Sequence, residues 1–334
     1  MRLRIRSACI AVAFVLLLSS GSRGEETLPA QLSDAEYWKI VSDFSEPNGY
    51  FQYEIVTSNE TSYQSVLPDL MKTPRSGGAY LGVGPEQNFT YIAALLPRIA
   101  FIIDIRRDML LEHLMYKAVF EMSVDRVEFV SNLFSRKRPT QLSLDASVQT
   151  LFEAYARVPA DRTLAEEHLK DILTRLKTTH HFALTTEDEA RIRMIYMDFL
   201  REGVISFSSS FMSPGYAALM TMTDRSGKNW SYLASKENYE RVRTMQQKNL
   251  IVPLVGDFAG PKAIRMAGQY LKDHAITVNA FYISNVEDYI RMWPAYIGNV
   301  ASLPIDASST LIRWSPSFST SLSSMTDFVR AGGR

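Results

Sequence analysis

The chain has 334 residues, and its 36 Lys and Arg residues balance 36 Asp and Glu residues, so its formal net charge is zero. No global field of one sign attracts nucleic acid or an anionic membrane, and we expect no nucleic-acid partner. An aromatic content of 11% suits a packed globular domain and argues against disorder.

Residues 1–24 have the pattern of a secretory signal. Three arginines among the first six residues form a basic region. The apolar run Ala8 to Leu18 has the length of a signal-peptide core and is too short to span a bilayer. Ser22 and Gly24 are small residues at the positions that cleavage after Gly24 requires. We therefore expect an exported protein, periplasmic or secreted, with no integral membrane segment in its mature chain. An uncleaved N-terminal anchor is the alternative.

The single cysteine of the chain, Cys9, lies inside this signal. The mature protein would then have no disulfide, no thiolate nucleophile and no cysteine-bound metal. Its core alone must stabilise it, and the roughly 310 remaining residues suffice, since a domain of that size buries about three quarters of its unfolded surface.

Residues 25–75 are expected to form a helical and extended segment that precedes the main domain. A capping-box pattern predicts a helix over 33–45. The alternating run Phe51 to Val56 indicates a strand, and residues 62–72 are expected to be helical.

Residues 76–334 are expected to form one Rossmann-like domain. Gly78 to Gly84 is a short apolar strand that ends in glycines, and residues 86–96 have helical spacing. Ile99 to Ile105 is a continuous apolar run, typical of a strand buried on both faces, and Arg107 to Met122 is a strong helical pattern. Strand, helix, strand and helix in this order predict a parallel sheet with right-handed crossovers.

Four helical patterns follow without a strand between them. They cover residues 124–133, 144–156, 164–177 and 187–202. We interpret residues 124–203 as a helical insertion beside the sheet.

The strand and helix alternation returns in the last third of the chain. The glycine-punctuated residues 203–227 are expected to contain a strand and a long loop. Strands are then expected at 250–255 and 276–283, and helices at 235–248, 262–272, 286–292 and 325–330. The predicted fold class is therefore α/β, a doubly wound and mostly parallel sheet with a helical insertion.

The first candidate binding element is the turn that contains Gly82 and Gly84. Glycines at a strand end let the backbone approach a ligand, and the following helix offers free N–H groups. Asp104, twenty residues after Gly84, ends the next strand, where a carboxylate can accept hydrogen bonds from a ribose. The third glycine of a dinucleotide fingerprint is missing after Gly84, which disfavours a nicotinamide cofactor. The alternative is a purely structural turn with Asp104 as a helix cap.

This stretch carries a resemblance to known proteins. The run YLGVGPEQNFTYIAALLPRIAFIID resembles motif I and the acidic second-strand end of class I S-adenosylmethionine-dependent methyltransferases, and the later GDFAGP and TVNAFYIS resemble the fourth and fifth strands of that fold. This resemblance implies a Rossmann-type fold and S-adenosylmethionine as a cofactor, held by Gly82, Gly84 and Asp104, with Glu86 near its methionine moiety. AFIIDIRRD, GDFAGPKA and FYISNVEDY also resemble a family of uncharacterised bacterial exported proteins over most of the mature chain, a resemblance that implies no established activity.

Two arginines follow the strand that ends at Asp104. Arg106 and Arg107 could clamp a carboxylate or phosphate in bidentate fashion. The alternative is that they pair with Asp104, Asp108 or Glu112.

Two later loops also follow strands and should reach the same edge of the sheet, where open α/β sheets bind ligands. Asp257 and Glu287 could act as a base or bind a cation, and Asn285 could hold a substrate through its amide. These three residues are the catalytic candidates. The alternative for each is a helix N-cap.

Two other chemistries are disfavoured. The five histidines have no metal-binding spacing, so we expect no metal site. The serine-rich run 206–213 lacks the GxSxG nucleophile pattern of a serine hydrolase.

The sequence thus favours an exported protein on a methyltransferase-like scaffold that binds a small-molecule ligand, or an enzyme of that fold that has lost its activity. An active S-adenosylmethionine-dependent methyltransferase and a structural envelope protein are the alternatives.

Overall fold

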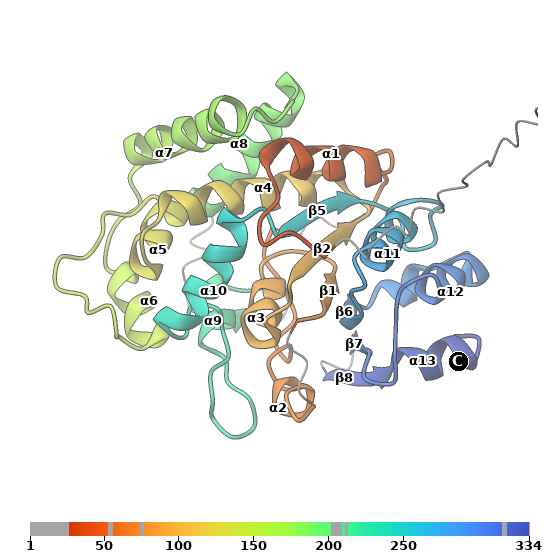
Figure 1. Ribbon diagram of the computed structural model, residues 1–334. Coiled ribbons are helices and arrows are strands. Elements are labelled where there is room, and N and C mark those ends of the chain that lie inside the picture. Colours follow the sequence, from red (N-terminus) through yellow and green to blue (C-terminus); the bar gives the residue numbers. More distant parts are fainter. Residues whose placement is uncertain are drawn as a thin grey trace, which may run out of the picture.

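The computed structural model describes residues 27–52, 56–73, 77–201, 209–210, 213–315 and 319–333, and a six-stranded sheet forms the centre of these residues (Figure 1). The strands are β1 (Ala79–Gly82), β2 (Ile99–Asp104), β5 (Ile251–Val255), β6 (Val278–Ser284), β7 (Thr310–Ser315) and β8 (Ser319–Ser324).

The strand order is β5-β2-β1-β6-β7-β8. All neighbouring pairs are parallel except β7 and β8, which are antiparallel. The chain winds outward from β1 in one direction through β2 and β5 and in the other through β6 and β7, so the order reverses between β1 and β6. This confirms the predicted α/β class and its mostly parallel, Rossmann-like sheet.

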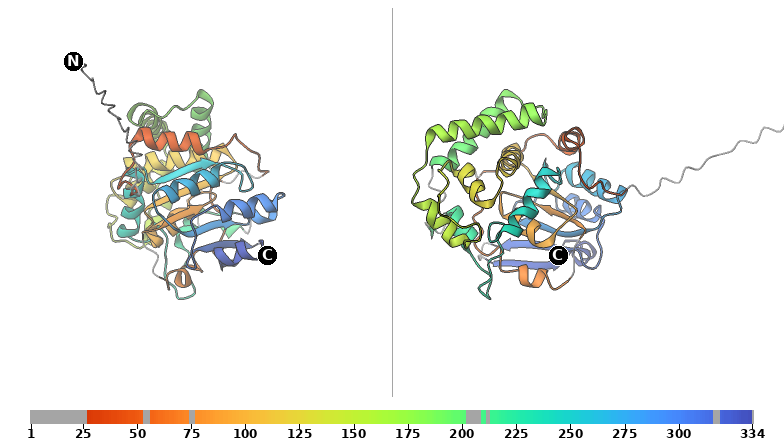
Figure 2. Two further views of the ribbon diagram at one scale, coloured as in Figure 1. Left: turned by 45° about the vertical axis from the view of Figure 1, so that its right-hand side comes forward. Right: turned by 60° about the vertical axis from the view of Figure 1, so that its left-hand side comes forward.

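Helices cover both faces of the sheet (Figures 1 and 2). On one face α4 packs on β2 and β5, α3 packs on β1, and α10 packs on both helices. On the other face α11 packs on β2 and continues through α12 to α13, while α1 packs against the edge strand β5. The bounds are α1 (Asp34–Phe44), α3 (Gln87–Leu95), α4 (Arg107–Met122), α10 (Lys236–Gln247), α11 (Ala263–Asp273), α12 (Trp293–Ala301) and α13 (Met325–Arg330).

The predicted insertion is helical in the described residues. Its helices α7 and α8 form a hairpin at the outside of the molecule, and α8 packs on α4 (Figure 1). The bounds are α5 (Arg126–Phe134), α6 (Val148–Ala156), α7 (Arg162–Thr174), the π-helix η1 (Arg175–Thr179) and α8 (Thr186–Arg201). The remaining short elements are α2 (Leu67–Leu70), β3 (Ser209–Ser210), β4 (Ser213–Pro214), α9 (Tyr216–Thr221) and the 3-10 turn η2 (Val286–Tyr289).

Local chemistry explains where several elements begin and end. Ser33 and Glu36 form the predicted capping box at the start of α1. Leu96 ends α3 in a left-handed conformation, directly before Pro97. Pro253 lies inside β5, which is tolerated because β5 is an edge strand and pairs only with β2.

Some predicted elements differ from the structure. The strand expected at 51–56 is wrong for residues 51, 52 and 56, which are not in a strand. Residues 53–55 lie outside the described residues. The signal expected at 1–24 also lies outside them. The helix expected over 62–72 shortens to α2, because residues 61–66 form turns. Helices α9 and α12 were not predicted. Across the described ranges, none of the helices has both the length and the apolar character needed to cross a membrane.

Candidate functional site

The glycine turn at the end of β1 is held by one side chain, Asn88. Its amide nitrogen donates to the carbonyl oxygens of Val83, Gly84 and Pro85 at 3.0, 3.0 and 2.8 Å, and its Oδ1 accepts from the Tyr80 hydroxyl at 2.8 Å. Gly84 has a φ of +77°, which glycine adopts without strain. Asn88 directly follows Gln87, which occupies the third-glycine position of a dinucleotide fingerprint, so polar side chains build the turn here.

Replacing Gly82 by Ala should destabilise the protein. An ideal Cβ there would lie 2.0 Å from Asn88 Oδ1 and 2.9 Å from a ring carbon of Tyr80. We expect Gly82→Ala to lower the free energy of unfolding by about 1–3 kcal/mol through overpacking. Gly298→Ala is the matched control, because the nearest atom to its Cβ is 3.7 Å away. Urea unfolding measures both variants, and equal stabilities would show that Asn88 does not hold the turn.

Asp104, predicted as a ribose-binding group, binds the protein's own backbone. Its Oδ1 accepts the Arg106 amide at 2.9 Å and lies 3.7 Å from the Arg106 guanidinium, and the Gly84 amide also contributes a hydrogen bond. Burial raises the pKa of Asp104, and the Arg106 charge partly opposes that shift. Asp104 thus links the end of β2 to the glycine turn.

The two arginines after β2 separate in the structure. Arg107 pairs with Asp188 of α8 in bidentate fashion at 2.6 and 2.9 Å. Arg106 is 8% exposed and lies at the carboxyl edge beside Asp104. Arg107 therefore fixes the insertion to the sheet, and Arg106 stays with the candidate site.

A segment before β1 crosses the carboxyl ends of the strands. We call residues 45–49 and 58–60 the edge strap. Residues 45 and 46 bond to the backbone of Val255 at the end of β5, and Gly49 donates to Ile105 O, after β2, at 2.8 Å. Beyond the gap at 53–55, Ser58 donates to Glu86, after β1, and Glu60 accepts hydrogen bonds from the β6 end. Along the chain, the edge strap therefore contacts the ends of β5, β2, β1 and β6 in turn, which is the order of these strands in the sheet.

Glu46 of the edge strap fills the loop that contains Asp257. Its carboxylate accepts the backbone N–H groups of Asp257, Lys262 and Ala263 at 3.2, 2.8 and 2.9 Å. Asp257 itself accepts the Ala259 amide at 2.8 Å. The donors at the start of α11 are therefore satisfied by the chain.

Glu60 lies at the strand-order reversal between β1 and β6. The hydroxyls of Tyr282 and Ser284 both donate to its carboxylate. Ser284 is partly exposed and has a φ of +53°, an uncommon conformation for a residue with a side chain. Gln87 Nε2 lies 3.4 Å from the Tyr282 hydroxyl, so the glycine turn and the end of β6 meet in one polar cluster.

The other residues predicted from this loop have separate roles. Ser284 Oγ lies 3.3 Å from Asn285 Oδ1, which keeps Asn285 beside the cluster. Glu287 pairs with Arg313 of β7 in bidentate fashion at 2.6 and 3.0 Å and accepts from the Tyr296 hydroxyl at 3.1 Å. Glu287 thus connects the η2 turn to β7 and α12.

Three buried carboxyl groups surround the glycine turn. Burial raises the pKa of Glu60 to about 7, although its two hydroxyl donors oppose the shift, and raises the pKa of Glu86 to about 8, although the backbone amides of Glu86 and Ser58 oppose it. Burial also raises the pKa of Glu112 well above its usual value, with a further upward effect from Glu86. Perturbed carboxyl groups of this kind concentrate at functional sites.

Several polar atoms around the turn have no hydrogen bond. Gln87 Oε1, Glu112 Oε1 and His113 Nδ1 are buried without a partner. His113 donates from Nε2 to Gly84 O at 2.9 Å, and burial lowers its pKa to about 4, so its Nδ1 is an open acceptor. Unpaired buried polar groups are rare in folded proteins, so these three atoms next to the glycine turn are available to a ligand.

A small cavity lies between this edge and the helical insertion. A cavity of about 40 Å³ lies beside Glu112 and Arg106 and is also lined by Val56, Asp108 and residues of α8. A site for a molecule of cofactor size usually has at least about 300 Å³. With the strap in place and Asp104 bonded to the backbone, the residues present do not fit an adenosyl cofactor.

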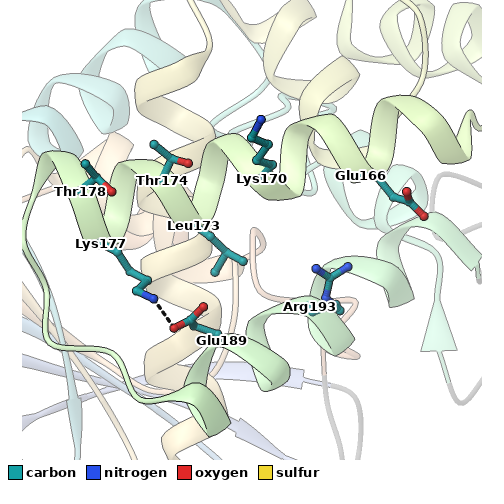
Figure 3. Close-up of a pocket in the computed structure, with 8 residues that line it drawn as sticks. All are labelled: Glu166, Lys170, Leu173, Thr174, Lys177, Thr178, Glu189 and Arg193. Carbon is teal, nitrogen blue, oxygen red and sulfur yellow. Dashed lines mark hydrogen bonds and ion pairs between the residues drawn. The ribbon is translucent and has the colours of Figure 1, made fainter.

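A larger hollow of about 500 Å³ lies elsewhere, between α7, η1 and α8 (Figure 3). Lys177 and Glu189 form an ion pair across it. All of its lining residues belong to the helical insertion, so it is separate from the carboxyl edge.

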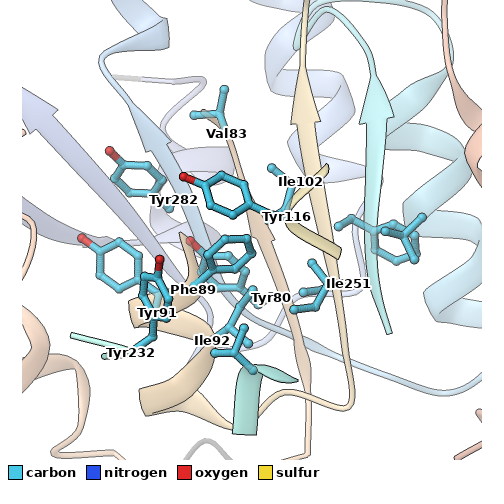
Figure 4. Close-up of a cluster of buried hydrophobic side chains, with 14 of the residues drawn as sticks. Tyr80, Val83, Phe89, Tyr91, Ile92, Ile102, Tyr116, Tyr232, Ile251 and Tyr282 are labelled. Atoms are coloured by element: carbon cyan, nitrogen blue, oxygen red, sulfur yellow. The ribbon is translucent and has the colours of Figure 1, made fainter. Parts of the chain in front are cut away.

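Tyrosines enclose the inner side of the glycine turn, a feature that sequence reasoning missed. Figure 4 shows Tyr80, Tyr91, Tyr116, Tyr232 and Tyr282 gathered around the turn and α3. Each is fully buried. Sequence reasoning also missed Glu60, and its only early signal was its place in the turn-rich segment before β1.

The fold and this site define a class: a Rossmann-like α/β protein with a polar cluster at the carboxyl edge of its sheet. The chain belongs to the family described as a domain of unknown function (DUF7790), whose model matches residues 55–327. No curated protein matches the chain in sequence.

Proposed function

We propose that this is an exported small-ligand-binding protein on a methyltransferase-like scaffold, with its site over the ends of β1 and β6. The observation that carries the proposal is the pair of buried, unbonded oxygens at this edge, Gln87 Oε1 and Glu112 Oε1. Leaving such atoms without a partner costs about 1–3 kcal/mol each, a cost that a ligand would remove on binding. The strand-order reversal is also where open α/β sheets bind ligands.

The edge strap belongs to the proposed site. Because Ser58 and Glu60 contact both sides of the reversal, a ligand that binds over the ends of β1 and β6 must displace part of the strap. The proposal therefore includes a movement of the strap when ligand binds.

A second candidate, an active S-adenosylmethionine-dependent methyltransferase, is favoured by the sheet order and by the position of Asp104 next to the glycine turn. It needs a larger movement of the strap, because an adenosyl group must reach Asp104.

Thermal shift and hydrogen exchange of the purified protein test both candidates. The probes are S-adenosylmethionine, S-adenosylhomocysteine and a panel of amino acids, amines, nucleosides and sugars. We expect a ligand to raise the melting temperature and to slow amide exchange in residues 58–60 and 82–88. Protection by the two adenosyl compounds supports the methyltransferase. If no compound protects these residues, both candidates are wrong and a structural envelope role is favoured.

A further inference from the structure

Several buried or partly buried acids of this protein have a cationic partner. Side chains that pair in this way are Asp104 with Arg106, Glu121 with Lys117, Asp188 with Arg107 and Glu287 with Arg313. Glu60, Glu86, Glu112 and Asp224 are each 5% exposed or less and have no Lys, Arg or His in ion-pair contact among the described residues. Of these four, Glu60 and Glu86 bond to the edge strap or the β6 end at the strand-order reversal. A buried carboxyl group without a counter-charge stays protonated, and it can ionise when a cation binds beside it.

A second observation comes from Gln87, which is 2% exposed. Its amide nitrogen lies 3.3 Å from Val83 O and 3.4 Å from the Tyr282 hydroxyl, the group that donates to Glu60. Its Oε1 has no hydrogen bond. An unpartnered acceptor thus lies beside the Glu60 cluster, and a complementary ligand must offer donors.

The surroundings of Glu60 are aromatic. The Tyr91 ring lies 5.2 Å from the Tyr282 ring and 6.1 Å from the Tyr80 ring. Tyrosine faces attract organic cations through their negative electrostatic potential. In the residues that the structure describes, no group of three or more His, Cys, Asp or Glu could hold a metal ion, so the missing charge fits an organic cation better than a bare metal.

We propose that the ligand of the edge site is an organic cation, a small ammonium compound bound by Glu60, Gln87 Oε1 and the neighbouring tyrosines. This inference rests on the proposed ligand-binding function. The ammonium group takes the hydrogen-bonding positions on Glu60 that Tyr282 and Ser284 occupy now. Ser284 is partly exposed, so the end of β6 gives the cation its route from solvent.

Calorimetric titration of the purified protein with matched pairs of probes tests the inference. The cations are choline, ethanolamine and putrescine, and their neutral isosteres are dimethylbutanol, ethanediol and butanediol. We expect at least one cation to bind and its isostere to give no heat. If no cation binds, or if the isosteres bind equally well, the inference is overturned. If only a neutral or anionic compound protects residues 82–88 from exchange, the proposed ligand-binding function is supported and the inference of a cationic ligand is wrong.

Variants locate the binding group. Glu60→Gln keeps the shape and removes the charge, and it should weaken cation binding at least about tenfold, as expected for loss of a charge-assisted hydrogen bond. Glu153→Gln, on the exposed side of α6, is the control and should leave binding unchanged. Gln87→Met removes the open acceptor and should also weaken binding, which keeps the test available if Glu60→Gln does not fold. Unchanged affinity in whichever of the Glu60 and Gln87 variants fold overturns the inference.

Discussion

Raising the pH from about 5.5 to about 8 should strongly destabilise this protein in the absence of ligand. Burial raises the pKa of Glu60 to about 7 and that of Glu86 to about 8, whereas both groups ionise near 4.5 in the unfolded chain. In this pH window the folded state holds more protons than the unfolded state, so the free energy of unfolding falls as pH rises. At 1.36 kcal/mol per pH unit, Glu86 contributes a loss of about 3 kcal/mol and Glu60 about 2 kcal/mol.

Two histidines modify this pH dependence. Burial lowers the pKa of His113 to about 4, whereas its value in the unfolded chain is 6.5. Below pH 6.5 the unfolded state binds a proton that folded His113 does not, so the free energy of unfolding is lower there. Raising the pH removes this penalty and offsets about 1 kcal/mol of the loss caused by Glu60 and Glu86. The pKa of His180 is raised, because Glu121 and Asp34 outweigh the effect of burial. As pH rises, His180 therefore loses the charge that stabilises the folded state, and this adds to the fall in the free energy of unfolding.

Glu86→Gln isolates one of these contributions. The amide does not titrate, so the difference in unfolding free energy between the two pH values should shrink by about 3 kcal/mol. Urea unfolding at both pH values measures this difference, and Glu153→Gln is the exposed control. A Glu86→Gln protein that keeps the wild-type pH dependence would show that Glu86 ionises normally in the folded state.

Sequence patterns predicted the sheet well because buried parallel strands and amphipathic helices leave periodic signals. Helix α4 begins and ends where its apolar spacing predicts, and β2 is a continuous apolar run. Helix α9 was missed because it is short and follows a serine-rich stretch without helical periodicity. The strand expected at 51–56 failed because local alternation does not show whether a partner strand is present.

The candidate site was only partly predictable. The rule that ligands bind at the carboxyl ends of parallel strands placed the glycine turn and Asn285 at neighbouring strand ends, and β1 and β6 do pair. Asp257 follows β5, two strands away from β1. Glu46 and Glu60 could not be foreseen, because their contacts join residues more than two hundred positions apart in the chain. No local pattern encodes the path of such a strap.

A second large effect is expected from the buried ion-pair network that links Lys117 and Glu121 of α4 to His180 and to Asp34 of α1. Lys117 has no exposed surface, and its ammonium donates to Glu121 at 2.7 Å and to Gln246 O at 2.6 Å. Glu121 also bonds to His180 at 2.7 Å, and His180 reaches Asp34 of α1 at 2.9 Å. This network joins α1, which leads directly into the edge strap, to the helix that covers the sheet.

Glu121→Gln should lower the free energy of unfolding by about 3–5 kcal/mol, because it leaves the Lys117 ammonium buried without its counter-charge. The double variant Lys117→Met with Glu121→Gln should recover part of that loss, since it removes the unpaired charge and fills the space with an apolar chain of similar length. Urea unfolding of the wild type, both single variants and the double variant gives the coupling energy. Hydrogen exchange in residues 45–49 should rise in Glu121→Gln, because α1 holds the start of the strap. Additive effects of the two substitutions would contradict this account and would mean that Lys117 is stabilised by Gln246 and Tyr37 alone.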